Sequence, residues 1–260
     1  MSSPAFLFTS TDRVLYRGAL GRPRPRVFGA AVCYGALEGA LRLSLSDGSQ
    51  WDAPAVRLPP GVAHQICVER GPVLCYLIEP EFVDWGGPCP SGPFQPEHLP
   101  ERAWRQALAD LCEADLRGWR DAGREPDAEL DRLVLGRPLP RRTLDARVAG
   151  VVERVRADPA IAWLAADAGA FCGLSASRFM HVFKDEVGGG WRAFRAWKRA
   201  RGLLDCVHSG ESLTQLALAL GYPDASHFSH AIRQVTGLRP SDIITGSRRL
   251  GVWQQTRDLP

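Results

Sequence analysis

The same short pattern occurs twice in the C-terminal part of the chain, and this repetition constrains the fold more than any other feature of the sequence. In the first copy, residues 173–175 (Gly-Leu-Ser) precede a segment in which Phe179, Val182 and Phe183 fall on one helix face. Glycine permits a tight turn, and a serine before a helix accepts hydrogen bonds from the free backbone N–H groups of the first turn. The pattern therefore predicts a helix, a turn and a second helix with a polar outward face.

The outward face of this second helix carries small and basic side chains. They are Ala176, Ser177, Arg178, His181 and Lys184. A short helix with such residues in its N-terminal half can reach base edges in the major groove of DNA. We therefore expect double-stranded DNA as the partner. The competing interpretation, that these are ordinary capped helices of an all-α domain, is weakened by the second copy.

The second copy begins at Ser212, which can form a capping box with Gln215, and it continues through a turn at Gly221. Asp224 opens the next helix, which again has one apolar face and one polar face. We expect this helix to be the second one that reads base edges. Its outward side chains are Ser226, His227, His230 and Arg233.

A basic segment joins the two copies. It extends from Trp191 to Val207 and has Arg192, Arg195 and Lys198 at polar positions. Residues 141–250 carry 16 Lys and Arg against 10 Asp and Glu, whereas the rest of the chain carries 16 against 19. Positive charge of this kind attracts the phosphate backbone whatever the base sequence. We expect a helix that holds the two copies at a fixed separation and, together with Lys184, contacts phosphates.

These residues resemble the DNA-binding domain of the AraC/XylS family of transcription regulators. The resemblance implies two helix-turn-helix units joined by one helix, and a sequence-specific regulator in the bacterial cytoplasm. It also makes RNA polymerase and a second copy of the chain candidate partners. Two registers of the first unit stay open, with the turn at either Gly173 or Gly169. The matching stretches are 174–179, 183–184, Gly188, 212–214, Ala217, 221–229 and 237–241.

The N-terminal part has a different pattern. Between Arg13 and Glu79, short runs rich in Val, Leu, Tyr and Cys alternate with turn residues, as is typical of antiparallel strands. We predict the fold class α+β, with a cupin-like antiparallel β-barrel in residues 1–95, accessory helices and a linker in 96–143, and an all-α domain with two helix-turn-helix units in 144–246. The expected strands are Val27–Tyr34, Ala40–Leu45, Ala55–Leu58, His64–Glu69 and Val73–Ile78, and the expected accessory helices are Arg102–Leu116 and Asp127–Leu135.

The stretch from Pro59 to His64 resembles the P-x-G-x-x-H motif of cupin barrels. In catalytic cupins this histidine joins others at a metal, but the partner motif H-x-H is missing upstream. A metal site needs three or four ligands, so we expect no metal, no cofactor and no enzyme activity. The resemblance instead implies a domain that binds a small effector or dimerises, with Tyr34, Trp51, His64 and Tyr76 as candidate effector contacts.

Two rival functions stay open on the sequence alone: a cupin-type enzyme with a degenerate regulator domain, and an interaction protein that keeps the helical fold without reading DNA. No run approaches the roughly 20 apolar residues that span a bilayer, and residues 1–10 lack a secretory pattern, so we expect a cytoplasmic protein without membrane contact. The seven cysteines include no C-x-x-C pair, which argues against a disulfide framework. Cys67 and Cys75, on predicted neighbouring strands, leave a thiol sensor as an alternative.

Overall fold

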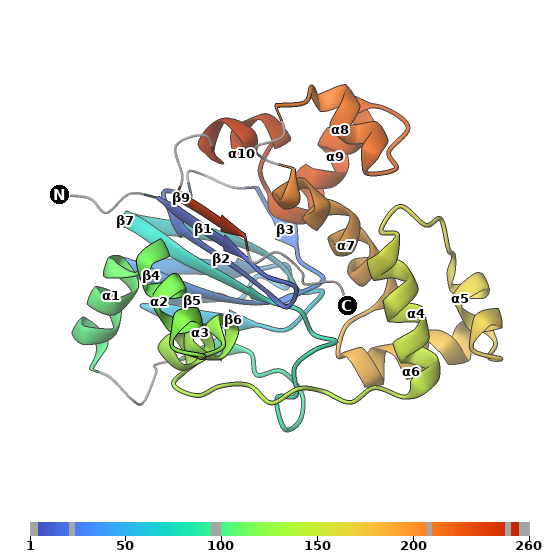
Figure 1. The fold of residues 1–260 in the computed structure, drawn as a ribbon, viewed down its shortest axis with the longest axis horizontal. Helices are drawn as coiled ribbons and strands as arrows, with labels where there is room; N and C mark the ends of the chain where they lie inside the picture. Colours follow the sequence, from blue (N-terminus) through green and yellow to red (C-terminus); the bar gives the residue numbers. More distant parts are fainter. Residues whose placement is uncertain (1–4, 21–23, 95–99, 207–209, 248–250, 255–260) are drawn as a thin grey trace.

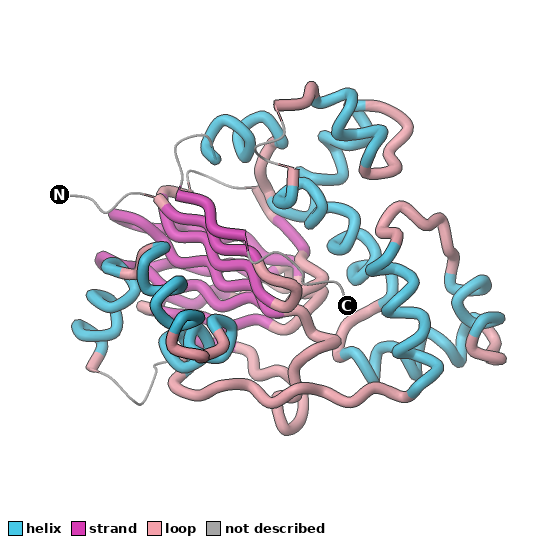
Figure 2. The backbone as a smooth tube through the Cα atoms, in the orientation of Figure 1, coloured by secondary structure: helices cyan, strands magenta, loops and turns pink. Residues whose placement is uncertain are grey.

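The computed structural model describes residues 5–20, 24–94, 100–206, 210–247 and 251–254. These residues form one sheet of nine strands with helices packed on both faces (Figures 1 and 2), which confirms the predicted α+β class. The strands are β1 (Phe6–Thr9), β2 (Arg13–Gly18), β3 (Arg26–Val27), β4 (Ala31–Leu45), β5 (Gln50–Ala53), β6 (Ala55–Leu58), β7 (Ala63–Ile78), β8 (Gly92–Pro93) and β9 (Gly251–Gln254).

The strands follow the order β8-β6-β4-β7-β2-β1-β9, with β3 added beside β7 and β5 beside β4. Neighbouring strands are antiparallel except for β1 and β9, which run parallel. Among the described residues, the end strands β8 and β9 do not pair with each other. In the part of the chain that the structure describes, the sheet is therefore continuous from β8 to β9 and not closed between these two strands.

Two long strands, β4 and β7, replace four of the expected short ones. Each continues through a glycine in the left-handed region, Gly39 with φ +63° and Gly71 with φ +71°, and their pairing changes register there. A glycine of this kind forms a bulge that bends a strand pair without ending it. The expected strand Ala55–Leu58 is present as predicted, and Gly48 and Gly61 adopt positive φ angles of +88° and +83° in the loops on either side of β5 and β6.

Helices cover both faces of the sheet, and the alternation of side chains along β4 and β7 decides what each face touches. Cys33 and Tyr76 pair across the two strands and face the accessory helices, whereas their neighbours Tyr34 and Cys75 face the C-terminal helices. This double cover explains the unbroken buried run at the end of β7. The accessory helices are α1 (Glu101–Asp110), α2 (Glu113–Asp121) and α3 (Pro126–Leu135).

The C-terminal helices match the sequence expectations closely. The turn of the first unit is Gly173, with φ +67°, which resolves the choice of register. Gly169 lies inside the preceding helix, where a Cβ atom would stand only 2.8 Å from the Leu174 carbonyl oxygen. Val207, the expected end of the basic helix, lies outside the described residues. The helices are α4 (Ala146–Ala157), α5 (Ala165–Phe171), α6 (Ala176–Val187), α7 (Trp191–Asp205), α8 (Leu213–Ala219), α9 (Ala225–Thr236) and α10 (Pro240–Ser247).

The described residues contain no disulfide bond. Cys67 and Cys75 lie on the same strand, β7, rather than on neighbouring strands, and burial raises the pKa of Cys75 to about 12. In the part of the chain that the structure describes, no group of three or more His, Cys, Asp and Glu side chains could hold a metal ion. No helix there is both long enough and apolar enough to cross a membrane.

Candidate nucleic-acid interface

The first unit consists of α5, the turn at Gly173 and α6. Ser175 caps α6, because its hydroxyl accepts a hydrogen bond of 3.3 Å from the backbone N–H of Arg178. Phe179 and Phe183 are fully buried and fix the rotation of α6 about its axis. The opposite side of α6 is therefore held outward.

The outward side of α6 carries the side chains that the sequence selects. Ser177, Arg178, His181 and Lys184 are exposed, and Ala176 is half-buried. Met180, which the sequence analysis did not select, is also 44% exposed on this face. The Met180 side chain is an unbranched thioether. Beside the polar side chains of this face, it adds apolar surface of the kind that contacts thymine methyl groups.

The second unit consists of α8, the turn at Gly221 and α9. Its first helix has the predicted capping box between Ser212 and Gln215. Asp224 caps α9 by accepting hydrogen bonds from the backbone N–H groups of Ser226, at 2.7 Å, and His227, at 2.8 Å. The His227 backbone N–H and ring lower the pKa of the Asp224 carboxyl, and the same carboxyl holds the ring at the start of α9.

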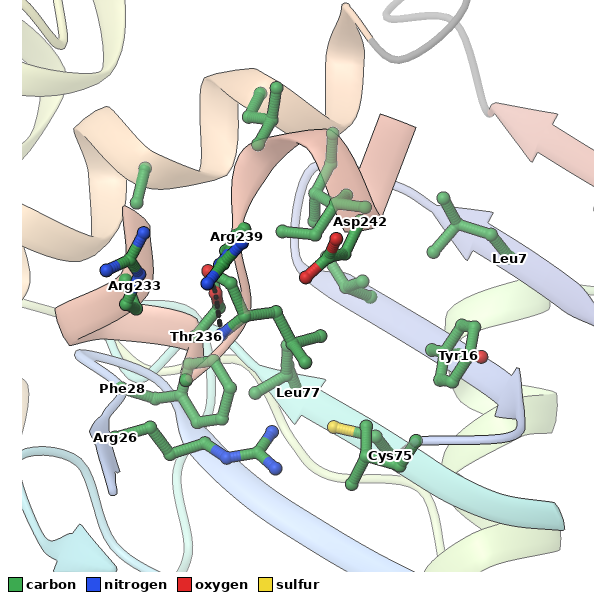
Figure 3. A pocket seen from close by; sticks show the side chains of 18 of the residues that line it. Leu7, Tyr16, Arg26, Phe28, Cys75, Leu77, Arg233, Thr236, Arg239 and Asp242 are labelled. Atoms are coloured by element: carbon green, nitrogen blue, oxygen red, sulfur yellow. Dashed lines mark hydrogen bonds between the residues drawn. The ribbon is translucent and has the colours of Figure 1, made fainter. Parts of the chain in front are cut away.

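The outward side of α9 agrees with the sequence at three positions and differs at a fourth. Ser226, His227 and His230 are exposed, and Gln234, one turn beyond His230, is exposed as well. Arg233 was expected to contact DNA, but it is half-buried and lines a cavity against the sheet (Figure 3). The expectation for Arg233 is corrected because α9 packs against β3, a contact that helix periodicity alone does not reveal.

The basic helix α7 is largely occupied by contacts within the chain. Arg192 is exposed, as a phosphate contact requires, whereas Arg195 donates a hydrogen bond of 2.6 Å to the Ile161 carbonyl oxygen. Lys198 is only 6% exposed and contacts the carboxylates of Glu79 and Glu81. The expectation that Lys198 contacts phosphate is therefore wrong for this conformation, because the sheet covers that side of α7.

A cavity of about 500 Å³ lies between the sheet and the second unit (Figure 3). One wall comes from β1, β2, β3 and β7, and the other comes from α7, α9, α10 and the turn at Gly237. This volume falls within the usual range for small-molecule sites. Most of the lining is apolar, but four arginines and one aspartate belong to it: Arg24, Arg26, Arg233, Arg239 and Asp242.

Arg26 is the unusual residue of this cavity. It is 2% exposed, its guanidinium lies over the rings of Phe28 and Tyr34, and its Nε and Nη2 atoms have no hydrogen-bond partner among the described residues. The Nε atom of Arg233 is also buried, and no described residue accepts a hydrogen bond from it. A buried cation with unsatisfied donors is costly unless an anion accepts from it, so this lining suits a negatively charged group.

The four candidate effector contacts do not gather in one place, and none of them lines this cavity. Tyr34 and His64 are neighbours, with the tyrosine oxygen 2.8 Å from the histidine Nε2. Trp51 lies half-buried on β5, and Tyr76 points to the opposite face of the sheet, where it donates to Asp131. The single-site expectation is corrected because successive strand positions alternate between the faces.

His64 has a structural role in this arrangement. Its Nδ1 lies 2.9 Å from the Val62 carbonyl oxygen, so this nitrogen carries the proton and Nε2 accepts from Tyr34. Burial lowers the pKa of His64 to about 4. The ring is therefore neutral at neutral pH, and its hydrogen bond with Tyr34 connects β7 to β4.

The chain matches a known family and known proteins in its C-terminal part. Residues 168–245 match the model of a helix-turn-helix domain family. The invasion protein InvF, from Salmonella typhi and from Salmonella typhimurium, is 36% identical over 72 residues, which is 27% of this chain and 33% of InvF. The chain carries an AraC-type helix-turn-helix domain. This AraC-type domain contains α6, α7, α8 and α9, and the match spans about a third of the length of the InvF proteins.

The whole fold, including the sheet, is similar to solved structures of ToxT from Vibrio cholerae. One of them has a TM-score of 0.56 with 9% identity, and another, from strain O395, has a TM-score of 0.57 with 10% identity. Each comparison covers 91% of this chain and 99% of the ToxT chain. At this identity the likeness establishes the fold alone.

Proposed function

We propose that this chain is a sequence-specific DNA-binding transcription regulator of the bacterial cytoplasm. The observation that carries the proposal is the pair of capped units, which present the polar faces of α6 and α9 outward from one AraC-type domain. Recognition helices of such pairs fit successive major-groove segments about 34 Å apart on one face of DNA. RNA polymerase and a second copy of the chain stay predicted partners.

The test of DNA binding is fluorescence anisotropy with DNA from upstream of the chain's own gene and neighbouring genes, with random DNA as competitor and with varied salt. Tight binding that resists random competitor supports a regulator. Weak binding that is equal for all sequences, even with effector candidates present, supports the rival interpretation of an interaction protein.

Arg178 and Arg192 should have different roles in this binding. Arg178→Ala removes a donor from the exposed face of α6, and we expect it to cost about 1 to 3 kcal/mol on the specific site and little on random DNA. Arg192→Ala should weaken both kinds of DNA alike and reduce the salt slope by about one. Anisotropy titrations of both variants against both DNAs measure this. Equal losses on specific and random DNA for both variants would contradict the assignment.

We further propose that a small amphipathic anion occupies the cavity beside Arg26 as effector. Two ToxT structures favour this class of effector. One has an unsaturated fatty acid bound, and the other has (E)-4-(8-methylnaphthalen-1-yl)but-3-enoic acid bound. Both molecules join an apolar body to one carboxyl group. The cavity has the matching combination of an apolar lining and a buried cation, Arg26, that has no anionic partner among the residues that the structure describes.

Decanoate and 1-decanol form a matched pair of probes for this cavity. We expect decanoate to raise the melting temperature and to change the fluorescence of Trp197, which lines the cavity, with decanol bound more weakly. Arg26→Met should weaken decanoate binding by roughly ten- to a hundredfold, the equivalent of about 1.5 to 3 kcal/mol for a lost charged hydrogen bond. Arg42→Met, on the exposed surface of β4, is the control. Equal affinity of the unaltered chain for both probes would contradict the proposal.

A further inference from the structure

A buried cluster of charged side chains joins the sheet to α7, and none of its members lines the cavity. Glu79 and Glu81 follow the end of β7 and are 1% and 2% exposed. The Nζ atom of Lys198 lies 2.6 Å from a Glu79 oxygen and also contacts Glu81, and the Nε atom of Arg201 lies 3.0 Å from Glu79. Two carboxylates and two cations therefore meet between the two halves of the chain.

Further contacts attach the same helix to the sheet. The indole N–H of Trp197 donates to both oxygens of Glu79 at 2.9 Å, and the Arg201 guanidinium donates to the backbone oxygens of Ser10 and Thr11. Burial acts to raise the pKa of Glu79, but Lys198 and Arg201 outweigh it and hold that pKa below its usual value. Glu79 is therefore ionised at neutral pH, and its negative charge offsets part of the positive charge of the two basic residues.

The backbones also approach closely beside this cluster. A Cβ atom on Gly29 would stand 2.3 Å from the carbonyl oxygen of Ala193 and 2.6 Å from the Cβ of Trp197. Such a distance cannot be accommodated while α7 stays in place. Gly29 is therefore a position at which one methyl group can separate α7 from the sheet without any change of charge.

Helix α7 contacts both helix-turn-helix units and the cavity. Its Phe194 packs against Phe183 of α6, it contacts α9, and Trp197 lines the cavity. While α7 is docked, Lys198 and Arg201 are withdrawn from solvent, and Arg233 of α9 is turned into the cavity. The docked arrangement thus presents fewer positive side chains to a polyanion than the released helices would.

We propose that Glu79 and Glu81, paired with Lys198 and Arg201, form an autoinhibitory lock that holds α7 on the sheet and keeps the AraC-type domain in a state of low DNA affinity. The inference rests on the proposed function and deepens it by naming how DNA binding is restrained. The two carboxylates take the place that phosphates would take beside these cations. Release of α7 frees both basic side chains and lets the two units adjust their relative position.

The test compares the DNA affinity of the unaltered full chain with that of Glu79→Gln/Glu81→Gln, by anisotropy over a range of salt concentrations. We expect the double variant to bind DNA roughly tenfold more tightly, within the range usual for allosteric coupling. The slope of log Kd against log salt should steepen by about one to two, because each released cation displaces about one counterion. Adding Lys198→Gln to the double variant should remove about half of the added slope.

Gly29→Ala provides a second, uncharged way to open the lock. It should raise DNA affinity and steepen the salt slope in the same direction, and it decides the question if the double glutamine variant does not fold. The control for the charge change is Glu38→Gln/Glu69→Gln, which alters two exposed carboxylates, one on β4 and one on β7. The control for the added methyl group is Gly118→Ala in α2, where a Cβ atom meets nothing within 4 Å.

Two negative outcomes have different meanings. If the unaltered chain binds DNA and folded unlocking variants bind with the same affinity and salt slope, the lock is overturned and the regulator function stands. If neither the unaltered chain nor any unlocked variant binds DNA, the lock and the regulator function are both overturned. Tighter binding by the unlocking variants and not by the controls supports both.

Discussion

Replacing Asp131 with alanine should lower the free energy of unfolding by about 3 to 5 kcal/mol, because it leaves a buried cation without its partner. Asp131 lies on α3 and is 1% exposed, and it accepts hydrogen bonds from Arg13 at 3.0 and 2.7 Å. It also accepts from the Tyr76 hydroxyl at 2.7 Å and the Leu139 backbone N–H at 3.1 Å. One carboxylate thus attaches the accessory helices to two strands and to the following loop.

Urea unfolding followed by circular dichroism measures this loss. The matched control is Asp52→Ala, which breaks a two-bond pair with Arg42 of 2.8 and 2.9 Å on the surface, where both side chains are more than half exposed. Water screens that pair, so we expect little change in the urea midpoint. Equal shifts for the two variants would show that burial of the Asp131 pair does not decide its contribution.

Replacing Phe183 with alanine should cost about 3 to 5 kcal/mol of stability in the first unit, the usual cost of removing a fully buried phenylalanine side chain. Phe183 is the centre of an aromatic cluster, with ring centroids 5.5 Å from Phe179 and 5.1 Å from both Trp191 and Phe194. This cluster sets the angle between α6 and α7. We therefore expect DNA affinity to fall together with stability.

The control for this variant is Met180→Ala on the same helix, where the side chain is 44% exposed. Urea unfolding should show almost no loss of stability for Met180→Ala, and any fall in its DNA affinity should reflect a lost contact with DNA rather than a disordered helix. Thermal melting and anisotropy measured on the same preparations separate the two effects. If Phe183→Ala binds DNA as tightly as the unaltered chain, the proposal that α6 contacts base edges is contradicted.

The parts of the site that the sequence predicts well are those determined within a few neighbouring residues. Ser175, Ser212 and Asp224 cap helices because each is followed by backbone N–H groups that need an acceptor, and this requirement is local. Helix periodicity likewise identifies Phe179 and Phe228 as core positions. The polar faces of α6 and α9 follow from the same periodicity.

The parts that the sequence does not predict depend on what packs against each element. Lys198 and Arg233 occupy polar positions of their helices, yet both turn toward the sheet because the AraC-type domain docks there. The continuous strands β4 and β7 were divided in two by the prediction, since a glycine at a bulge resembles a glycine at a turn. Glu79 gave no signal, because its partners Lys198 and Arg201 are distant in the sequence. Arg26 gave none, because the cavity beside it forms only when α7, α9 and α10 pack against the sheet.

The pairing of β9 with β1 restricts the C-terminal helices α4 to α10, which precede β9 in the chain. Residues 251–254 run parallel to Phe6–Thr9, so the chain returns to the sheet after α10 and the helices are tethered to it at both ends. Two short tethers give α7 a high effective concentration at its docking surface. The docked state can therefore predominate even when each contact that maintains it is weak, and a modest change in those contacts is enough to shift the balance.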